Sequence, residues 1–332
     1  MCSGIKLVCK DGSVFLCRTL EFAHQFKYSK YESDDLLGIL GDGLVLDGLN
    51  KYGLCAMAFY YSEYNEYSNM EVKGNDNLKS LHVVEFLLKN ARNIPDVRKL
   101  VDKITVLNSV YKPWGIVPPL HWMCADKTGE CIVLEVIDGV MKVYDNELNV
   151  FTNSPRFPEQ VMMLQNFPKF SSKQVKDNPS YGTGFLGLPG DFTSPSRFAR
   201  LSTFEKNYQR PETVKEGINT AFHILNNFDI VHGYTLEKGG LTENTQYTVV
   251  YDLKHFDAWS KTYHDQTIRN LRDNTEFKLI KENFVNGVDT PSNDTNKKLN
   301  NKCSKIPIIV LSSLILILII IIFLGFISCN RS

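Results

Sequence analysis

The first residues of the chain carry groups that could do nucleophilic chemistry. Cys2 directly follows Met1, and a cysteine is small enough for methionine aminopeptidase to remove the residue before it. Removal would leave one residue with both a thiol nucleophile and a free α-amine that can serve as its base. The reference pKa values, about 8.5 for a thiol and about 7.7–8.0 for an α-amine, let both groups ionise near neutral pH. The alternative is that a cysteine follows Met1 by chance.

A predicted β-hairpin would bring two charged side chains back to this start. Two short runs of apolar and β-branched residues, 4–9 and 14–19, flank an Asp-Gly pair, which is a strong hairpin signal. The hairpin would return Arg18 and Glu21 toward Cys2. A guanidinium there would favour the thiolate, and a carboxylate would hold the α-amine. An ordinary surface ion pair between the two residues is the alternative.

The remaining expected elements come in groups. Strands are expected at 43–47, 54–61, 120–125, 131–137, 140–144, 150–153 and 246–252. Apolar residues at three- and four-residue spacing predict helices at Leu81–Ala91, Pro95–Ile104, 157–166, 195–207 and 213–226. Groups of strands and then groups of helices favour α+β layers over βαβ winding.

Several motifs, taken in order, resemble a known family. They are the start at Cys2, Asp47–Leu54, Pro118–Met123 with Ala125-Asp126 and Gly129-Glu130 after it, Thr152–Pro155, and Gly187–Phe198. They resemble the choloylglycine hydrolase family of N-terminal-nucleophile amidases, which holds conjugated bile acid hydrolases and penicillin V acylases. The resemblance spans residues 2 to about 265. It implies a four-layer αββα sandwich and hydrolysis of a non-peptide carbon–nitrogen amide through an acyl-thioester intermediate.

The resemblance also assigns roles to matching residues. Cys2 would be the nucleophile and base, with Arg18 beside its thiol, and Arg197 would be a second arginine that braces the site. Glu21 stands where the family usually carries Asp, so it would contact the α-amine with one more methylene. That departure leaves open a protein of another class, a catalytically inactive membrane-tethered binding protein.

The resemblance implies two donors for the oxyanion of the tetrahedral intermediate. The side-chain N–H of Asn153 would be one and the backbone N–H of Tyr60 the other, and such donors typically contribute about 2.7–4 kcal/mol each. Penicillin V acylases of the family tend to carry Tyr at the second position and bile salt hydrolases Asn, which favours an aromatic acyl substrate such as penicillin V. Conjugated bile salts and N-acyl lipid amides are the alternatives. Five aromatic residues could wall the acyl pocket or belong to the core: Phe22, Phe26, Phe59, Tyr60 and Tyr61.

The end of the chain predicts a transmembrane tail anchor at 306–328. The segment from Ile306 to Ile327 has no charged residue, and about 20 apolar residues span a bilayer as a helix. Four lysines precede the segment and one arginine follows it, which places the preceding domain on the cytoplasmic side. A GPI signal and a buried helix are the competing interpretations. A polar linker at 287–305 would join the anchor to an amidase domain at 1–286, from which Met1 is removed.

The composition speaks against other function classes. Basic and acidic residues number 37 each among 332 residues, which gives no reason to expect a nucleic-acid partner. The eight cysteines include no CxxC pair and the seven histidines no HExxH motif, so no disulfide framework, metal or cofactor is predicted. No signal peptide is recognised, which favours the reducing cytosol for the main domain. The expected partners are an N-acyl amide substrate and the membrane, and a homo-oligomer stays open.

Overall fold

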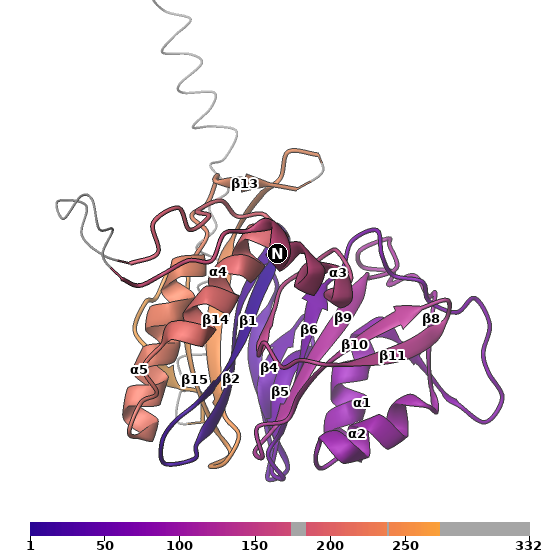
Figure 1. The fold of residues 1–332 in the computed structure, drawn as a ribbon. Helices are drawn as coiled ribbons and strands as arrows, with labels where there is room; N and C mark the ends of the chain where they lie inside the picture. Colours follow the sequence, from indigo (N-terminus) through magenta and orange to yellow (C-terminus); the bar gives the residue numbers. More distant parts are fainter. Residues whose placement is uncertain (174–183, 238, 273–332) are drawn as a thin grey trace, which may run out of the picture. The chain divides into compact units, whose positions relative to one another are not determined.

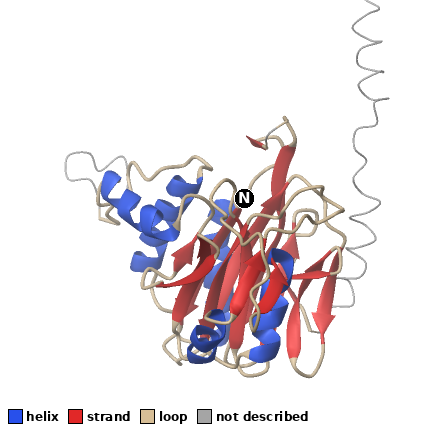
Figure 2. Ribbon diagram, turned by 90° about the vertical axis from the view of Figure 1, so that its right-hand side faces the viewer, coloured by secondary structure: helices blue, strands red, loops and turns tan. Residues whose placement is uncertain are grey.

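Two β-sheets lie face to face at the centre of the described part of the chain (Figure 1). The computed structural model describes residues 1–173, 184–237 and 239–272. Helices cover the outer face of each sheet, so that the layers run helix, sheet, sheet, helix. Figure 2 shows the strands in the middle of the molecule from a second direction. The predicted combination of helices and strands in layers is therefore present.

The first sheet contains the start of the chain. Its order is β12-β1-β2-β14-β15-β16, with β13 paired to β14. The Asp-Gly turn closes the predicted hairpin, because Gly12 adopts a φ of 80° and the Asp11 side chain accepts from the Ser13 N–H at 2.8 Å. The strands are β1 (Cys2–Val8), β2 (Val14–Phe22), β12 (Val150–Phe151), β13 (Thr235–Leu236), β14 (Thr242–Asp252), β15 (Asp257–Thr262) and β16 (Arg269–Asn270).

The second sheet is built from the next part of the chain. Its order is β11-β10-β9-β6-β5-β4-β3, and all its neighbouring strands are antiparallel. The strands are β3 (Tyr28–Glu32), β4 (Leu36–Gly41), β5 (Leu44–Asn50), β6 (Leu54–Tyr60), β9 (Leu120–Asp126), β10 (Cys131–Ile137) and β11 (Val140–Asp145). A separate parallel pair joins β7 (Asp76–Lys79) to β8 (Ile104–Leu107).

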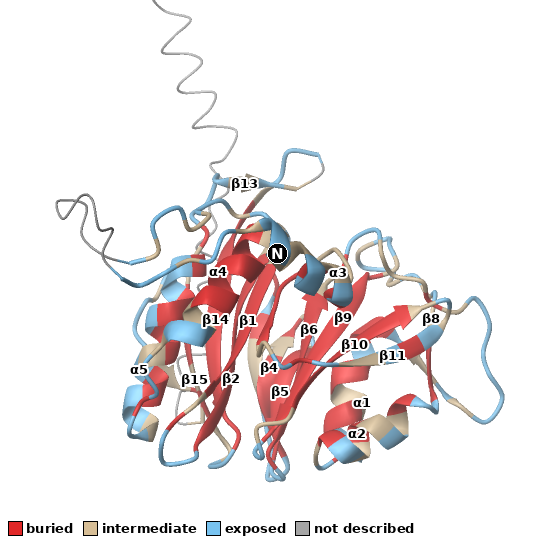
Figure 3. Ribbon diagram, viewed as in Figure 1, coloured by how far each residue is buried: buried red, intermediate tan, exposed pale blue. Residues whose placement is uncertain are grey.

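The helices pack on the sheets through apolar faces and leave polar faces outside (Figure 3). On the second sheet lie α1 (Val83–Asn90) and α2 (Ile94–Val101), and on the first lie α4 (Ser194–Asn207) and α5 (Val214–Leu225). The short α3 (Phe157–Met163) packs against α4. Capping fixes where two of them begin: the side chains of Asn93 and Thr213 accept the N–H of Asp96 and Glu216.

The two sheets approach closely at β1 and β6. A Cβ added to Gly4 would lie 2.6 Å from the ring of Phe59, so only glycine fits there. In β6 the residues alternate, with Met57 and Phe59 facing the other sheet and Ala56 facing the core around α1 and α2. Trp122 of β9 is fully buried in the same core, between the second sheet and the helices α1 and α2. A large apolar side chain typically contributes about 1.5–3 kcal/mol by such burial.

Several predicted boundaries differ from the structure. The strand expected at 150–153 ends at Phe151, so Asn153 follows the strand instead of ending it. The helix expected over Pro95–Ile104 ends at Val101, because Ile104 pairs with Asp76 in a strand. Six observed strands lie wholly outside the predicted elements: β3, β4, β7, β13, β15 and β16. A seventh, β8, shares only Ile104 with the predicted helix.

The predicted linker at 287–305 and the predicted anchor at 306–328 lie outside the described residues. Within the three described ranges, no helix combines the length and the apolar composition that crossing a membrane requires. The chain divides into two units, Met1–Lys281 and Glu282–Ser332, and the second unit holds no described residue. The boundary expected after residue 286 therefore stays a prediction.

Candidate active site

The thiol of Cys2 is buried and faces a guanidinium. Arg18 Nη2 donates to Cys2 Sγ at 2.8 Å, and Cys2 is 3% exposed. The pairing of β1 with β2 sets Gly4 opposite Arg18 and Cys2 opposite Leu20. The hairpin therefore brings Arg18 to the chain start, as the sequence predicts. A positive charge at this distance favours the thiolate over the thiol.

Arg18 is itself held by a buried polar network. Its Nη1 donates to Ala58 O at 2.6 Å and to Asp47 Oδ2 at 3.4 Å. The Asp47 carboxylate also accepts from Tyr251 Oη at 2.6 Å and from Tyr247 Oη. Burial alone would lower the pKa of Arg18, but its acidic neighbours, Cys2 first, more than reverse this and raise it. Sequence reasoning missed the orienting role of Asp47, although the residue opens one of the family-like motifs.

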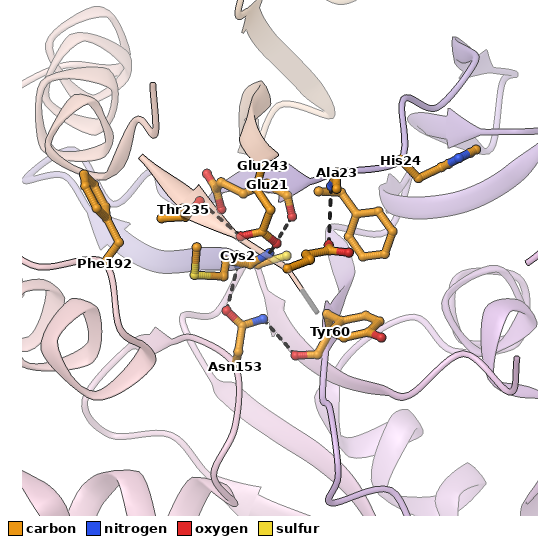
Figure 4. Close-up of polar contacts among 12 residues, drawn as sticks. Cys2, Glu21, Ala23, His24, Tyr60, Asn153, Phe192, Thr235 and Glu243 are labelled. Carbon is orange, nitrogen blue, oxygen red and sulfur yellow. Dashed lines mark hydrogen bonds and ion pairs between the residues drawn. The ribbon is translucent and has the colours of Figure 1, made fainter. Parts of the chain in front are cut away.

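The Asn153 side chain is bonded to Cys2 and to Tyr60 (Figure 4), and also to Arg197. Its Oδ1 accepts from the Cys2 backbone N–H at 2.8 Å and from Arg197 Nη2 at 2.7 Å. Its Nδ2 donates to Tyr60 O at 2.8 Å, which leaves the second Nδ2 proton for another acceptor. Two donors on Oδ1 fix the orientation of the amide group, so the amide N–H groups point away from the Cys2 nitrogen.

The backbone N–H of Tyr60 points to the same side of β6 as its carbonyl. Tyr61 N–H donates to Pro119 O at 2.7 Å across the β6–β9 pair. Since successive residues of a strand direct their N–H groups to opposite edges, the Tyr60 N–H points away from β9. Its carbonyl is bonded to Asn153, so the Tyr60 N–H lies on the edge where Asn153 lies.

Arg197 ties α4 to the start of β1. Its side chain is fully buried. Nη1 donates to Cys2 O and, at 2.9 Å, to Ser3 Oγ, while Nε donates to Phe192 O at 2.9 Å. Burial lowers the pKa of Arg197, and the neighbouring Glu21 charge opposes that shift. The predicted second arginine of the site therefore contacts Cys2 through the Cys2 backbone carbonyl.

Glu21 is buried beside the site, but its carboxylate has no contact with Cys2 in the hydrogen-bond pattern. Glu21 Oε1 accepts from Thr245 Oγ1 at 2.9 Å, and Oε2 has no hydrogen-bond partner. Burial raises the pKa of Glu21 to about 7, while the Met1 amine and Arg197 oppose the shift. With Met1 attached, the Cys2 nitrogen is an amide, so the predicted contact between Glu21 and a free α-amine stays a prediction.

The family of the chain follows from its similarity to known proteins. The model of the linear amide C–N hydrolases, choloylglycine hydrolase family, matches residues 36–293. The chain belongs to the choloylglycine hydrolase family. An uncharacterized protein from Paramecium bursaria Chlorella virus 1 is 39% identical over 280 residues, which cover 82% of this chain and 100% of that protein. A bile salt hydrolase/transferase from Lactiplantibacillus plantarum is 30% identical over 73% of this chain and 78% of its own length.

Solved structures agree with this membership. A variant of the conjugated bile acid hydrolase from Clostridium perfringens matches with a TM-score of 0.72 and 26% identity, covering 81% of this chain and 91% of that one. The penicillin V acylase from Agrobacterium tumefaciens shares the fold, with a TM-score of 0.62 at 18% identity over 80% of this chain and 84% of that one.

In this choloylglycine hydrolase family member, Met1 occupies the space next to Cys2. Its amine donates to Glu21 O at 2.5 Å and forms an ion pair with Glu243 Oε1 at 3.0 Å. Glu243 is 4% exposed and its Oε2 accepts from Thr235 Oγ1 at 3.3 Å. Burial and the charge of Glu243 raise the pKa of the neighbouring Glu237. The sequence motifs do not predict either glutamate near Cys2, because both belong to the β13–β14 hairpin, which contains none of those motifs.

A cluster of aromatic rings lies next to Tyr60. The Phe22 ring is 5.3 Å from the Tyr60 ring, 5.4 Å from that of Phe26 and 5.7 Å from that of Trp114. Trp114 lies in a turn closed by the bridge between Tyr111 and Ile116 and is not among the residues expected from the sequence. The other two predicted wall residues lie elsewhere: Phe59 packs on Arg18 and Phe151, and Tyr61 stacks on His121.

A buried histidine supports the segment that carries Asn153. His121 Nε2 lies 3.2 Å from Thr152 O, and Nδ1 lies 3.1 Å from Glu135 Oε1. Burial lowers the pKa of His121, although the Glu135 contact opposes the shift. On its other side, the Asn153 N–H donates to Ser194 Oγ at 3.1 Å. Contacts on both sides therefore fix the backbone at Asn153.

The remaining thiols differ from Cys2 in their surroundings. Burial raises the pKa of Cys9 to about 11 and of Cys131 to about 12, so both stay protonated at neutral pH. All six cysteines in the described ranges are free thiols. In the same ranges, no group of three or more His, Cys, Asp or Glu side chains is arranged to hold a metal ion.

Proposed function

We propose that the protein hydrolyses linear, non-peptide carbon–nitrogen amide bonds with Cys2 as an N-terminal nucleophile. One observation carries the proposal: a guanidinium nitrogen lies 2.8 Å from the Cys2 thiol while the Cys2 nitrogen lies 2.8 Å from the Asn153 amide oxygen. This arrangement suits a mechanism in which Cys2 is both the nucleophile, through its thiol, and the base, through its nitrogen. Family membership supports the reaction class.

The first half of the reaction forms a thioester. Once the Met1–Cys2 bond is cut, the Cys2 α-amine takes the thiol proton and Arg18 stabilises the thiolate. The sulfur attacks the acyl carbonyl, and the oxyanion accepts hydrogen bonds from Asn153 Nδ2 and the Tyr60 backbone N–H. When the tetrahedral intermediate collapses, the carbon–nitrogen bond breaks and the α-ammonium gives its proton to the leaving amine.

The second half releases the acid. Water attacks the thioester carbonyl and gives a proton to the α-amine, the same two donors hold the oxyanion, and the carbon–sulfur bond breaks to restore the Cys2 thiol. Arg197 keeps the Cys2 backbone and Asn153 in register throughout. Glu21 orients the α-amine through the carboxylate oxygen that has no partner while Met1 is attached.

The aromatic cluster favours a flat, apolar acyl group. Phe22, Phe26 and Trp114 form one cluster of rings with Tyr60, whose backbone N–H is the second proposed oxyanion donor. A phenoxyacetyl group, the acyl half of penicillin V, suits such a wall because aromatic pairs add about 0.5–1.5 kcal/mol beyond their area. Acyl groups of conjugated bile acids and of lipid amides are the alternatives.

We also propose that residues 306–328 anchor the enzyme in a membrane with the catalytic domain on the cytoplasmic side. The support is the uncharged apolar segment and the lysines before it. An anchored amidase would meet amphiphilic N-acyl amides at the membrane surface.

The test is amine release by the full-length protein in detergent. The panel contains penicillin V, glycine- and taurine-conjugated bile acids, N-acyl amino acids and phenoxyacetyl amides of simple amines, with Cys2→Ala as the control. Release that disappears in Cys2→Ala supports the proposal and ranks the acyl groups. Intact mass shows whether Met1 is gone. A protein that retains Met1 and is inactive on every substrate would favour the membrane-tethered binding protein, and inactivity with Met1 removed would favour a different N-acyl lipid amide as substrate.

A further inference from the structure

The space next to the Cys2 nitrogen ends at a carboxylate. Met1 fills this space, and its ammonium group pairs with Glu243 Oε1 at 3.0 Å. Figure 4 shows Glu243 and Glu21 on one side of Cys2 and Asn153 on the other. Glu243 belongs to the β13–β14 hairpin, which extends beyond the sheet at the end where the N-terminus lies (Figure 1). The chain's own amine therefore shows that this position accepts a cation.

The proposed reaction puts the leaving group into the space that Met1 vacates. The Cys2 α-amine must pass a proton to the scissile nitrogen, which requires a separation of about 2.6–3.2 Å. Met1 is bonded to that same Cys2 nitrogen. The opposite side of the nitrogen is taken by Asn153 Oδ1 at 2.8 Å. Groups attached to the scissile nitrogen therefore extend toward Glu243.

Cutting the Met1–Cys2 bond leaves the carboxylates of this region with few cations. Glu243 loses its ion-pair partner. The neighbouring side chain, Glu237, is also acidic and therefore cannot replace that partner. Two buried arginines lie near Cys2: Arg18 is bonded to Asp47, and Arg197, whose charge also acts on Glu243, is bonded to Asn153 and the Cys2 backbone. In the proposed mechanism, the α-amine that this cut creates pairs with the Glu21 oxygen that has no partner in the structure. A buried carboxylate without a partner is costly, so a cationic ligand group is favoured here.

We propose that Glu243, with Glu237 beside it, forms a leaving-group subsite for a cation. The substrates are N-acyl derivatives of amines that carry a second, positively charged amino group, such as monoacylated diamines. This inference rests on the proposed amidase function. Like charge disfavours leaving groups that carry a carboxylate or sulfonate, as glycine and taurine do.

The test uses one acyl group and three leaving groups on the full-length protein. Monophenoxyacetyl ethylenediamine is cationic, phenoxyacetyl propylamine is neutral, and phenoxyacetyl glycine is anionic. We expect kcat/KM to be roughly tenfold higher for the cationic than for the neutral amide, which corresponds to about 1.4 kcal/mol, and lowest for the anionic one. A neutral or anionic amide that is cleaved as well as the cationic one overturns the subsite.

Variants separate charge recognition from positioning. Glu243→Gln should lower the ratio of cationic to neutral kcat/KM from about ten to about one, and Glu243→Lys should favour the anionic amide. The matched control is Glu212→Gln, an exposed glutamate that pairs with Lys10, and it should keep the ratio. If Glu243→Gln slows all three amides by the same factor, Glu243 positions the α-amine and the subsite is wrong.

A binding measurement keeps the two proposals distinguishable. In Cys2→Ala protein whose mass shows that Met1 is removed, calorimetry compares the ethylenediamine and propylamine amides. Tighter binding of the cationic amide that is lost in Cys2→Ala/Glu243→Gln supports the subsite. This result would hold even if the wild type cleaved none of the amides. That lack of cleavage would reject the amidase function and leave the subsite standing. Equal binding of both amides, or binding of neither, overturns the subsite.

Discussion

Arg18 joins the Cys2 thiol to the Asp47 carboxylate through one guanidinium group, with Nη2 on the sulfur at 2.8 Å and Nη1 on Oδ2 at 3.4 Å. Arg18 and Asp47 are both fully buried. Neither charge is solvated, so each depends on the other and on the tyrosine hydroxyls around Asp47. Asp47 therefore fixes the orientation of Arg18 toward Cys2, from the side of the guanidinium opposite the thiol.

Asp47→Asn should lower both stability and activity. The substitution keeps the shape but leaves the Arg18 charge without its carboxylate, and breaking a buried pair typically costs about 3–5 kcal/mol. Urea unfolding measures the stability, and the pH dependence of Cys2 alkylation measures how strongly Arg18 favours the thiolate. Asp145→Asn is the control, because that exposed aspartate pairs with Arg98 and should cost about 0–1 kcal/mol. An unchanged alkylation profile in Asp47→Asn would contradict the orienting role.

Asn153→Ala should lower kcat by about 100- to 1000-fold, since it removes the side-chain donor that we propose for the oxyanion. KM should change much less, because the contact strengthens in the transition state. Steady-state kinetics on the best substrate separates the two constants. Asn108→Ala, which removes an exposed amide bonded to Asn69, is the control. Wild-type kcat in Asn153→Ala would remove the residue from the mechanism.

Much of the site could be predicted from the sequence where the determinants are local. The Asp-Gly turn is sufficient to predict the hairpin that brings Arg18 to Cys2, and the registers bear this out. The family-like motifs identify Asn153 and Arg197, and the structure brings both to Cys2. These residues lie within or next to short motifs that can be recognised directly in the sequence.

The rest depends on pairings that no local pattern encodes. Glu243 is 242 positions away from the amine that it contacts, and it looks like any exposed hairpin glutamate in sequence. Tyr247 and Tyr251 alternate along β14 as ordinary strand residues do, and only the pairing of β14 with β2 brings them toward Asp47. Trp114 lies in a turn without a regular sequence pattern, so its approach to Phe22 follows from tertiary packing alone.

Glu21 should make stability fall as pH rises through neutrality. With Met1 attached, its pKa is about 7 in the folded protein and about 4.5 ordinarily, so between these values the folded state of the form that retains Met1 keeps a proton that the unfolded state has released. The contribution is fully present below about pH 4.5 and is lost as pH rises through 7, with a size of about 3 kcal/mol.

The measurement for Glu21 is the unfolding free energy of wild type and Glu21→Gln from pH 4 to 8. The unfolding free energy of the wild type, measured relative to that of Glu21→Gln, should decrease as pH increases. Glu212→Gln, at an exposed glutamate, should show no such trend. A difference that is flat across this range would mean that Glu21 is charged in the folded state at all these pH values.

Deleting residues 287–332 should release the protein from membranes and leave Cys2-dependent amide hydrolysis in the soluble fraction. The reason is that the uncharged apolar segment and its preceding lysines all lie in the deleted part. Fractionation of cells that express each form, followed by extraction with carbonate, measures the association. Continued membrane association of the shortened protein would reject the anchor at 306–328.

Trp114→Ala should weaken binding of aromatic acyl groups more than it affects the chemical step. The indole ring lies 5.7 Å from Phe22, 5.6 Å from Phe26 and 5.4 Å from Tyr111, so its loss opens the wall beside Tyr60. We expect KM for phenoxyacetyl amides to rise about tenfold, from the loss of aromatic contacts and buried area, with a smaller change in kcat. Tyr52→Ala, at an aromatic residue that is 46% exposed, is the control. If KM stays the same while acetyl amides are cleaved as well as phenoxyacetyl amides, the acyl group binds elsewhere.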